Sequence, residues 1–271
     1  MELAARQGGV LINADASQVY RDLSVLSARP TAADEARVPH RLFGVLDGAE
    51  SCSASRWAVL ARAEVARAWQ AGQLPILVGG TGLYLRTLLW GIAPVPPVAE
   101  EVRAEIRAMD AVDARAALET EDAGMAARLH PNDRQRNARA LEVWRSTGRS
   151  LADWQRQPPE GGLRSLVRLR PLLLDPPADE LRARVDARID WMWTNGALEE
   201  ARRLAARRLA PGLPVLRAIG VPPLLALLEG GLDRRQALER WRIDTRRYAR
   251  RQLTWFRHQT PDWPRHWPRW L

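Results

Sequence analysis

One stretch of the sequence most constrains the fold: an apolar run, Leu74–Val78, that stops at Gly79-Gly80-Thr81-Gly82. The run predicts a buried β-strand, and the apolar residues at positions 83–89 recur with helical character. In α/β proteins a strand, a glycine turn and a helix start bring backbone N–H groups close to a ligand. The stretch therefore predicts an α/β fold with Thr81 facing a ligand. An ordinary turn in which the Thr81 hydroxyl caps the helix remains an alternative.

A second short strand is predicted at Val10–Ile12, and Asp15 follows it. Open α/β sheets keep their ligand residues just past the carboxyl ends of strands. A carboxylate there can act as a general base or hold a divalent cation, and an Asx-turn or helix N-cap is the alternative. Residues 1–9 are typical of the last turns of a helix that ends at a glycine, so we expect the sequence to begin inside an element.

The charge of the chain comes from arginine alone. All 41 basic residues are arginine, and the formal net charge is +9. This excludes a Schiff-base lysine and a P-loop lysine within these residues. Arginine suits phosphate binding and stacking on bases, which favours a nucleic-acid partner over a merely solvated basic surface.

Cys52 is the one cysteine, which excludes an intramolecular disulfide and a cysteine metal cluster. The sequence has no apolar run of about 18 residues and no signal-peptide pattern. We therefore expect a cytoplasmic protein without a membrane partner.

A proline-rich boundary at residues 94–97 divides the chain. Residues 98–162 have helical patterns and no strand signal, so we expect a helical insertion between a first α/β part, 1–97, and its completion with basic C-terminal helices, 163–271. Strand character at 166–174 predicts that the chain rejoins the sheet there.

Two helical segments have features of nucleic-acid binding. In the insertion, Gln135 and Arg139 share a helix face, with Arg136 beside them. An amide between arginines suits an RNA backbone or a splayed base, and a solvated face is the alternative. In the last helix, expected from Asp233 to Arg257, arginine pairs repeat every four residues and predict a basic ridge.

Six motifs, taken in order, resemble those of the tRNA dimethylallyltransferases, the isopentenyl-diphosphate:tRNA transferases. The resemblance is carried by Asp15–Tyr20, Ser27–Pro30, Gly79–Tyr84, Asn132–Val143, Arg217–Gly220 and Thr245–Phe256. Each motif is only moderately specific, but their order along nearly the whole chain is highly specific.

The resemblance implies a P-loop NTPase-like parallel sheet flanked by helices, with an all-helical insertion that grips the tRNA anticodon stem-loop. It implies transfer of a dimethylallyl group from dimethylallyl diphosphate to N6 of the adenosine 3′ of the anticodon, position 37 of the tRNA. It also implies nucleotide (ATP) binding of the P-loop type, Mg²⁺ as cofactor and a monomeric protein.

The same resemblance implies roles for individual residues. Asp15 is expected to be the catalytic base and a metal ligand, Thr81 to be catalytic, and Arg217 to bind the diphosphate. The expected tRNA contacts are Asp15, Ala16, Ser17, Gln18, Thr81, Arg103, Gln135, Arg136, Asn137, Ala138 and Arg139.

The chain departs from the family pattern at its start. The family opens with a strand, Gly-x-Thr-x-x-Gly-Lys-Ser/Thr and a helix, and this sequence shows none of them. We therefore expect either a true start upstream or a catalytically inactive, tRNA-binding remnant. Another P-loop enzyme, such as a small-molecule kinase, is a third hypothesis. Ala16 replaces a serine, and Val221-Pro222 replace a tyrosine and a basic residue found in many members.

Overall fold

The computed structural model describes residues 1–267 and divides into two compact units. One unit joins Met1–Leu88 to Val167–Leu271, and the other is Leu89–Leu166. The helical insertion expected at 98–162 lies inside the second unit. The part expected at 163–271 is described as far as Trp267, and residues 268–271 lie outside the described residues.

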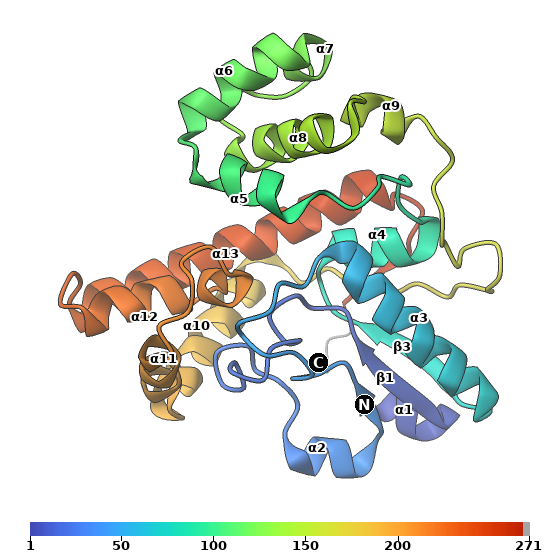
Figure 1. Ribbon diagram of the computed structural model, residues 1–271. Helices are drawn as coiled ribbons and strands as arrows, with labels where there is room; N and C mark the ends of the chain where they lie inside the picture. The colour runs from blue at the N-terminus through green and yellow to red at the C-terminus, as the bar shows by residue number, and fades with distance from the viewer. Residues whose placement is uncertain (268–271) are drawn as a thin grey trace. The chain divides into compact units, whose positions relative to one another are not determined.

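A small parallel sheet forms the centre of the first unit (Figure 1). Its strands β1 (Gly9–Asn13), β2 (His40–Arg41) and β3 (Leu74–Val78) lie in the order β2-β1-β3. All five residues of β1 are buried, which is expected of a strand with a neighbour on each side. The expected α/β class, a parallel sheet flanked by helices, is confirmed.

The expectation that β3 is a buried strand is wrong in one respect. Leu74 and Val78, the first and last residues of β3, are each 45% exposed. Among residues 1–267, β3 pairs only with β1 and therefore lies at an edge of the sheet. An apolar run alone does not reveal whether a strand lies inside a sheet or at its edge, and here β1 is the middle strand.

The prediction that residues 166–174 rejoin this sheet is also wrong. Only β4 (Leu173–Leu174) is a strand, and it pairs in parallel with β5 (Arg265–His266) in a separate two-stranded sheet. Pro171 and Pro176 flank β4 closely. Because proline has no N–H to donate to a ladder, this segment forms only a very short strand.

The helices of the first unit include the one that the sequence predicts from Asp233 to Arg257. α13, the long helix of Figure 1, begins at the capping box of Asp233 with Gln236. Asn195 and Gly196 separate α10 from α11. These helices are α1 (Glu2–Gln7), α2 (Ala32–Arg37), α3 (Ala54–Gln70), α4 (Gly82–Trp90, across the unit boundary), α10 (Ala178–Thr194), α11 (Ala197–Ala206), the 3₁₀ helix η1 (Pro214–Arg217), α12 (Val221–Leu228) and α13 (Arg234–Gln259).

The second unit is built from helices, as its composition predicts. They are α5 (Glu100–Ala108), α6 (Ala111–Glu121), α7 (Ala123–Ala126), α8 (Arg134–Thr147) and α9 (Leu151–Gln155). Ile106, Leu118 and Leu141 are buried at its centre, and each contributes about 1.5–3 kcal/mol by leaving water. The unit therefore has a hydrophobic core of its own.

In the part of the chain that the structure describes, every helix is too short or too polar to cross a lipid bilayer.

Candidate active site

The loop that follows β1 is held by Asn13, a fully buried asparagine at the end of that strand. Its Oδ1 accepts a 2.8 Å hydrogen bond from the backbone N–H of Asp15, and its Nδ2 donates to the carbonyl oxygens of Asp15 and Leu42. The Asn13 carbonyl in turn accepts from Nε1 of Trp57, which is also buried. A satisfied network of this kind fixes the backbone of Asp15.

The two carboxylate oxygens of Asp15 differ in their surroundings. Oδ1 accepts hydrogen bonds from the backbone N–H groups of Ser17 at 2.8 Å and Gln18 at 3.3 Å. This is the Asx-turn that the sequence left open as an alternative. Oδ2 forms no hydrogen bond within residues 1–267, and the side chain is half-buried. One oxygen therefore shapes the loop, and the other is free to meet a substrate or a cation.

The glycine turn after β3 packs directly on this loop. A Cβ on Gly79 would collide with the backbone of Ala14, so the close approach requires glycine. The Thr81 N–H donates to the carbonyl of Ala14 at 3.1 Å, and the Thr81 Oγ1 accepts from the N–H of Ala16 at 2.9 Å. The Thr81 hydroxyl thus joins the carboxyl ends of β1 and β3.

Two residues of α13 complete the turn. Nε2 of Gln252 donates a 2.9 Å hydrogen bond to the carbonyl of Gly80, where a Cβ would collide with this amide. The hydroxyl of Tyr248 lies near the side chains of Thr81 and Gln252. Burial raises the pKa of Tyr248, and the nearby charge of Asp15 raises it further. Tyr248 is therefore a neutral hydroxyl at neutral pH.

Sequence reasoning gave neither of these residues a role, although both fall in the last family-like motif. Their spacing could have indicated a shared role, because residues four apart lie on one face of a helix.

Arg188 of α10 is a further charged group at this site. Its Nη2 donates to the carbonyl of Ser27 at 3.2 Å. Burial lowers the pKa of the guanidinium, and the charge of Asp15 opposes that shift. The sequence did not single out Arg188, because nothing distinguishes it from the other arginines of this helical region.

Arg217, the expected diphosphate ligand, ends η1. Burial raises the pKa of the Tyr20 phenol, and Arg217 is one of the charges that oppose this shift. The backbone N–H of Cys52 also donates to the Tyr20 hydroxyl. Arg217 therefore lies close enough to Tyr20, the last residue of the loop that begins with Asp15, to act on its charge.

The residues expected to contact tRNA from the insertion lie on or near α8, within the second unit. Gln135 and Arg136 are exposed, and Arg139 lies 3.4 Å from the carboxylate of Glu142. Arg103, on α5, forms a 2.7 Å ion pair with Glu100.

Asn137 and Ala138 face inward instead. Asn137 is fully buried, its Nδ2 donates to the carbonyl oxygens of His130 and Pro131, and its Oδ1 accepts from Arg115. Ala138 packs against the hydrophobic core. Both side chains therefore pack toward the interior of the unit, because a helix with a buried stripe turns some residues of any run toward the core. The expected tRNA contacts at these two positions stay predictions.

The predicted basic ridge of α13 is partly neutralised. Arg246 binds both carboxylate oxygens of Asp186 at 2.6 Å, and Arg242 binds Asp190 at 2.5 Å. Arg251 lies over the ring of Tyr248. Arginine spacing predicted the stripe but not the aspartates of α10 that face it.

Residues 1–267 contain no group of three or more His, Cys, Asp or Glu side chains that could hold a metal ion. Mg²⁺, however, is commonly bound by one or two carboxylates together with phosphate oxygens of a substrate. The free Oδ2 of Asp15 fits that limited role.

Comparison with known proteins places this geometry in a family. The model of a family described as "IPP transferase" matches residues 18–259. A protein from Sphingopyxis alaskensis described as tRNA dimethylallyltransferase is 56% identical over 95% of this chain and 84% of its own length.

Two solved structures are also similar. The full-length tRNA isopentenylpyrophosphate transferase of Bacillus halodurans is 30% identical, with a TM-score of 0.68 over 97% of this chain and 84% of that one. A eukaryotic dimethylallyltransferase acting on tRNA is 26% identical, with a TM-score of 0.78 over 96% of this chain and 67% of that one. The chain belongs to the IPP transferase family.

Proposed function

We propose that this protein transfers a dimethylallyl group from dimethylallyl diphosphate to N6 of adenosine 37, the nucleotide 3′ of the anticodon in tRNA. The observation that carries the proposal is the half-buried carboxylate of Asp15, whose Oδ1 is fixed by the loop and whose Oδ2 is left free, in a loop that Thr81 holds through the N–H of Ala16. Relatives that are 50–56% identical are described as tRNA dimethylallyltransferases, which supports the same reaction here.

The proposed chemistry needs a base, because the lone pair of an exocyclic amine is delocalised into the purine ring. Oδ2 of Asp15 removes a proton from N6 while the nitrogen forms its bond to the dimethylallyl carbon. The carbon–oxygen bond to the diphosphate breaks, and the diphosphate leaves with the electron pair. Arg217 and Arg188 supply positive charge toward this leaving group. Thr81 and Tyr248 orient the loop that carries the base.

Magnesium fits this proposal as a cofactor held by the diphosphate of the donor, and Asp15 can ligate it only while Oδ2 is not accepting the proton of N6. When bound, it would offset negative charge on the leaving group. An adenine can reach the Asp15 carboxylate only after it has left the stack of neighbouring nucleobases in the RNA. We assign the exposed Gln135 and Arg136, with Arg139 and Arg103, to contacts with the anticodon stem-loop. We also propose that the protein works in the cytoplasm, because tRNA is modified there. We propose that it works as a monomer.

Replacing Asp15 by Asn tests the proposal. Asn keeps an Oδ1 that can accept from the Ser17 N–H, so the loop is retained while the base is lost. We expect transfer to fall by about 10²–10⁴-fold and tRNA binding to stay near that of the wild type. The measurements are incorporation of radiolabelled dimethylallyl into unmodified tRNA and a binding titration. Asp113→Asn, at an exposed aspartate of α6, is the matched control.

Unchanged transfer by Asp15→Asn would remove Asp15 from the mechanism. Wild-type protein that binds the tRNA but transfers nothing would favour an inactive RNA-binding remnant. Phosphorylation of a small acceptor with little affinity for tRNA would favour a kinase.

A further inference from the structure

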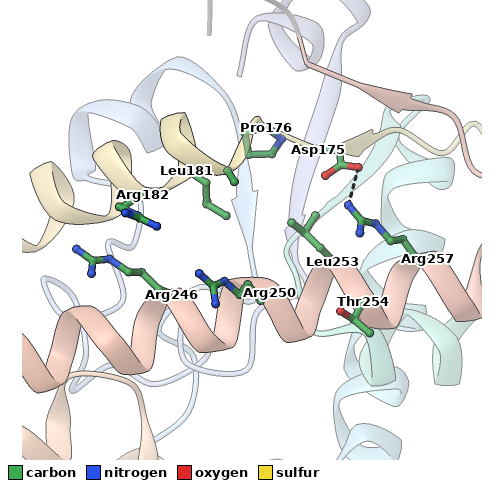
Figure 2. A pocket seen from close by; sticks show the side chains of 10 residues that line it. Asp175, Pro176, Leu181, Arg182, Arg246, Arg250, Leu253, Thr254 and Arg257 are labelled. Atoms are coloured by element: carbon green, nitrogen blue, oxygen red, sulfur yellow. Dashed lines mark ion pairs between the residues drawn. The ribbon is translucent and has the colours of Figure 1, made fainter.

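We propose that a pocket between α10 and α13, separate from the Asp15 site, binds a phosphate group. The pocket has a volume of about 360 Å³, within the range of small-ligand sites. Figure 2 shows Arg182 on α10, with Arg246 and Arg250 extending from α13 toward it. Leu181 and Leu253 supply an apolar wall. The inference does not rest on the proposed transfer reaction, because binding alone tests it.

The charges around this pocket are unbalanced. Four arginines line it, and Asp175 is the one carboxylate among the described residues that do. Asp175 already pairs with Arg257 at 3.6 Å, as the dashed line in Figure 2 marks. Arg182 and Arg250 form no hydrogen bond or ion pair within residues 1–267. Two guanidinium groups without acids at one cavity favour an anion, and their planar donors match phosphate oxygens.

Arg246 provides a second, independent observation. Its Nη2 binds both oxygens of Asp186, but its Nε is buried and has no hydrogen-bond partner. A buried N–H without an acceptor is costly and rare in native proteins. A small shift of the Arg246 side chain toward a phosphate oxygen in the pocket would give this N–H an acceptor.

The N-terminus of α10 adds backbone N–H donors, whose partial positive charge has the same sign as that of the arginines. Pro177 is its N-cap and offers no side-chain cap, and Ala178, the first helical residue, lines the pocket. The first N–H groups of a helix have no partner within the helix and carry partial positive charge. Glu180 of this first turn is engaged by Arg184 and by Nε1 of Trp267.

The pocket faces away from the Asp15 site. Arg246 and Arg250 each lie two residues from Tyr248, hence roughly 200° around the helix axis from it. Tyr248 points to Thr81, so a ligand of the arginines lies on the other face of α13. The bound group is therefore distinct from the leaving group at Asp15. Two sources of such a phosphate are a phosphate of the RNA backbone and a free diphosphate.

Calorimetric titration with sodium pyrophosphate tests the site. We expect wild-type protein to bind pyrophosphate and the double variant Arg182→Gln/Arg250→Gln to bind it at least about tenfold more weakly. Arg235→Gln is the matched control, because Arg235 is exposed on the same helix, about 22 Å along the axis from Arg250. Circular dichroism confirms that each variant is folded.

Equal affinity of the double variant and the control would overturn the proposal, because pyrophosphate would then bind only elsewhere, as beside Asp15. Absence of any binding to the wild type would overturn it as well. Once pyrophosphate is shown to bind in the pocket, competition with an anticodon stem-loop RNA identifies the source of the phosphate group.

If the RNA displaces pyrophosphate, and the double variant lowers the salt dependence of RNA binding by about one unit, the group is a backbone phosphate. If RNA and pyrophosphate bind independently, the pocket holds a free diphosphate.

Discussion

The Oγ1 of Thr81 accepts a 2.9 Å hydrogen bond from the backbone N–H of Ala16, a residue 65 positions earlier in the chain. The bond joins the glycine turn after β3 to the loop that carries the Asp15 carboxylate. With its oxygen directed at Ala16 and its hydroxyl near that of Tyr248, the Thr81 side chain is held in one orientation. The position of the proposed base thus depends on a side chain from the neighbouring strand.

Replacing Thr81 by Val should therefore lower kcat. Valine has the same shape but no acceptor, so the partly buried N–H of Ala16 loses its partner at a cost of about 1–3 kcal/mol. We expect kcat for dimethylallyl transfer to fall about tenfold or more while tRNA affinity changes little. Thr81→Ser keeps the hydroxyl and should stay close to wild type. Steady-state kinetics of the two variants check this, and equal kcat values for Val and Ser would contradict it.

Glu200 braces the site from a distance. This buried carboxylate of α11 accepts from the backbone N–H groups of Ser24, Val25 and Leu26, and also from the Ser24 hydroxyl at 2.6 Å. The loop so held presents the Ser27 carbonyl, which binds Arg188.

Glu200→Gln should thus lower stability by about 2–3 kcal/mol, because an amide N–H₂ would face backbone donors, and kcat should fall with it. Chemical denaturation and transfer kinetics measure the two effects. Glu199→Gln, at the exposed neighbour, should change stability by less than about 0.5 kcal/mol. Equal losses in both variants would refute the bracing role.

Arg136 of α8 gives a prediction about RNA binding. Its side chain is 77% exposed and lies 3.4 Å from Asp133, a pairing too exposed to hold it firmly. If Arg136 contacts a tRNA phosphate, Arg136→Gln should weaken binding and reduce the slope of log affinity against log salt by about one. Titrations at several salt concentrations measure the slope. Arg128→Gln, at an exposed arginine of the same unit, should leave it unchanged.

Arg145 makes the second unit sensitive to acid. It binds Glu121 and Glu105, each at 2.6 Å, and its hydrogen bond to Glu121 lowers the pKa of that carboxyl. A lowered carboxyl pKa contributes stability above the ordinary value of about 4.5, and this stability is lost as pH falls through the lowered value.

Arg145→Gln should therefore cost about 1 kcal/mol at pH 7 and much less at pH 3. Urea denaturation at both pH values, followed by helical circular dichroism, measures the difference. The prediction fails if the cost is the same at both pH values.

The sequence was informative where chemistry and local pattern coincide. Asp15 and Thr81 follow strands and stand next to turn-forming residues, so their meeting at one edge of a parallel sheet could be expected. Arg188 and Tyr248 could not be placed in this way. They reach the site through the packing of α10 and α13, and a helical period does not say which neighbour a face will meet.

The strand predictions show the same limit. The apolar residues of β3 indicated a strand but not its edge position, which depends on pairing with segments elsewhere in the chain. Near β4, apolar residues between prolines suggested a longer strand than the backbone can form. Asn137 illustrates the reverse case, since a polar residue in an arginine-rich motif serves the interior of its unit.

The hydrogen bond from Gln252 to the carbonyl of Gly80 spans 172 residues. During synthesis, the ribosome releases Gly80 long before Gln252 has been translated. The glycine turn therefore lacks this hydrogen bond until α13 has been synthesised. A nascent chain that stops short of α13 carries the proposed base on a loop without this support, so the turn is complete only in chains that include α13.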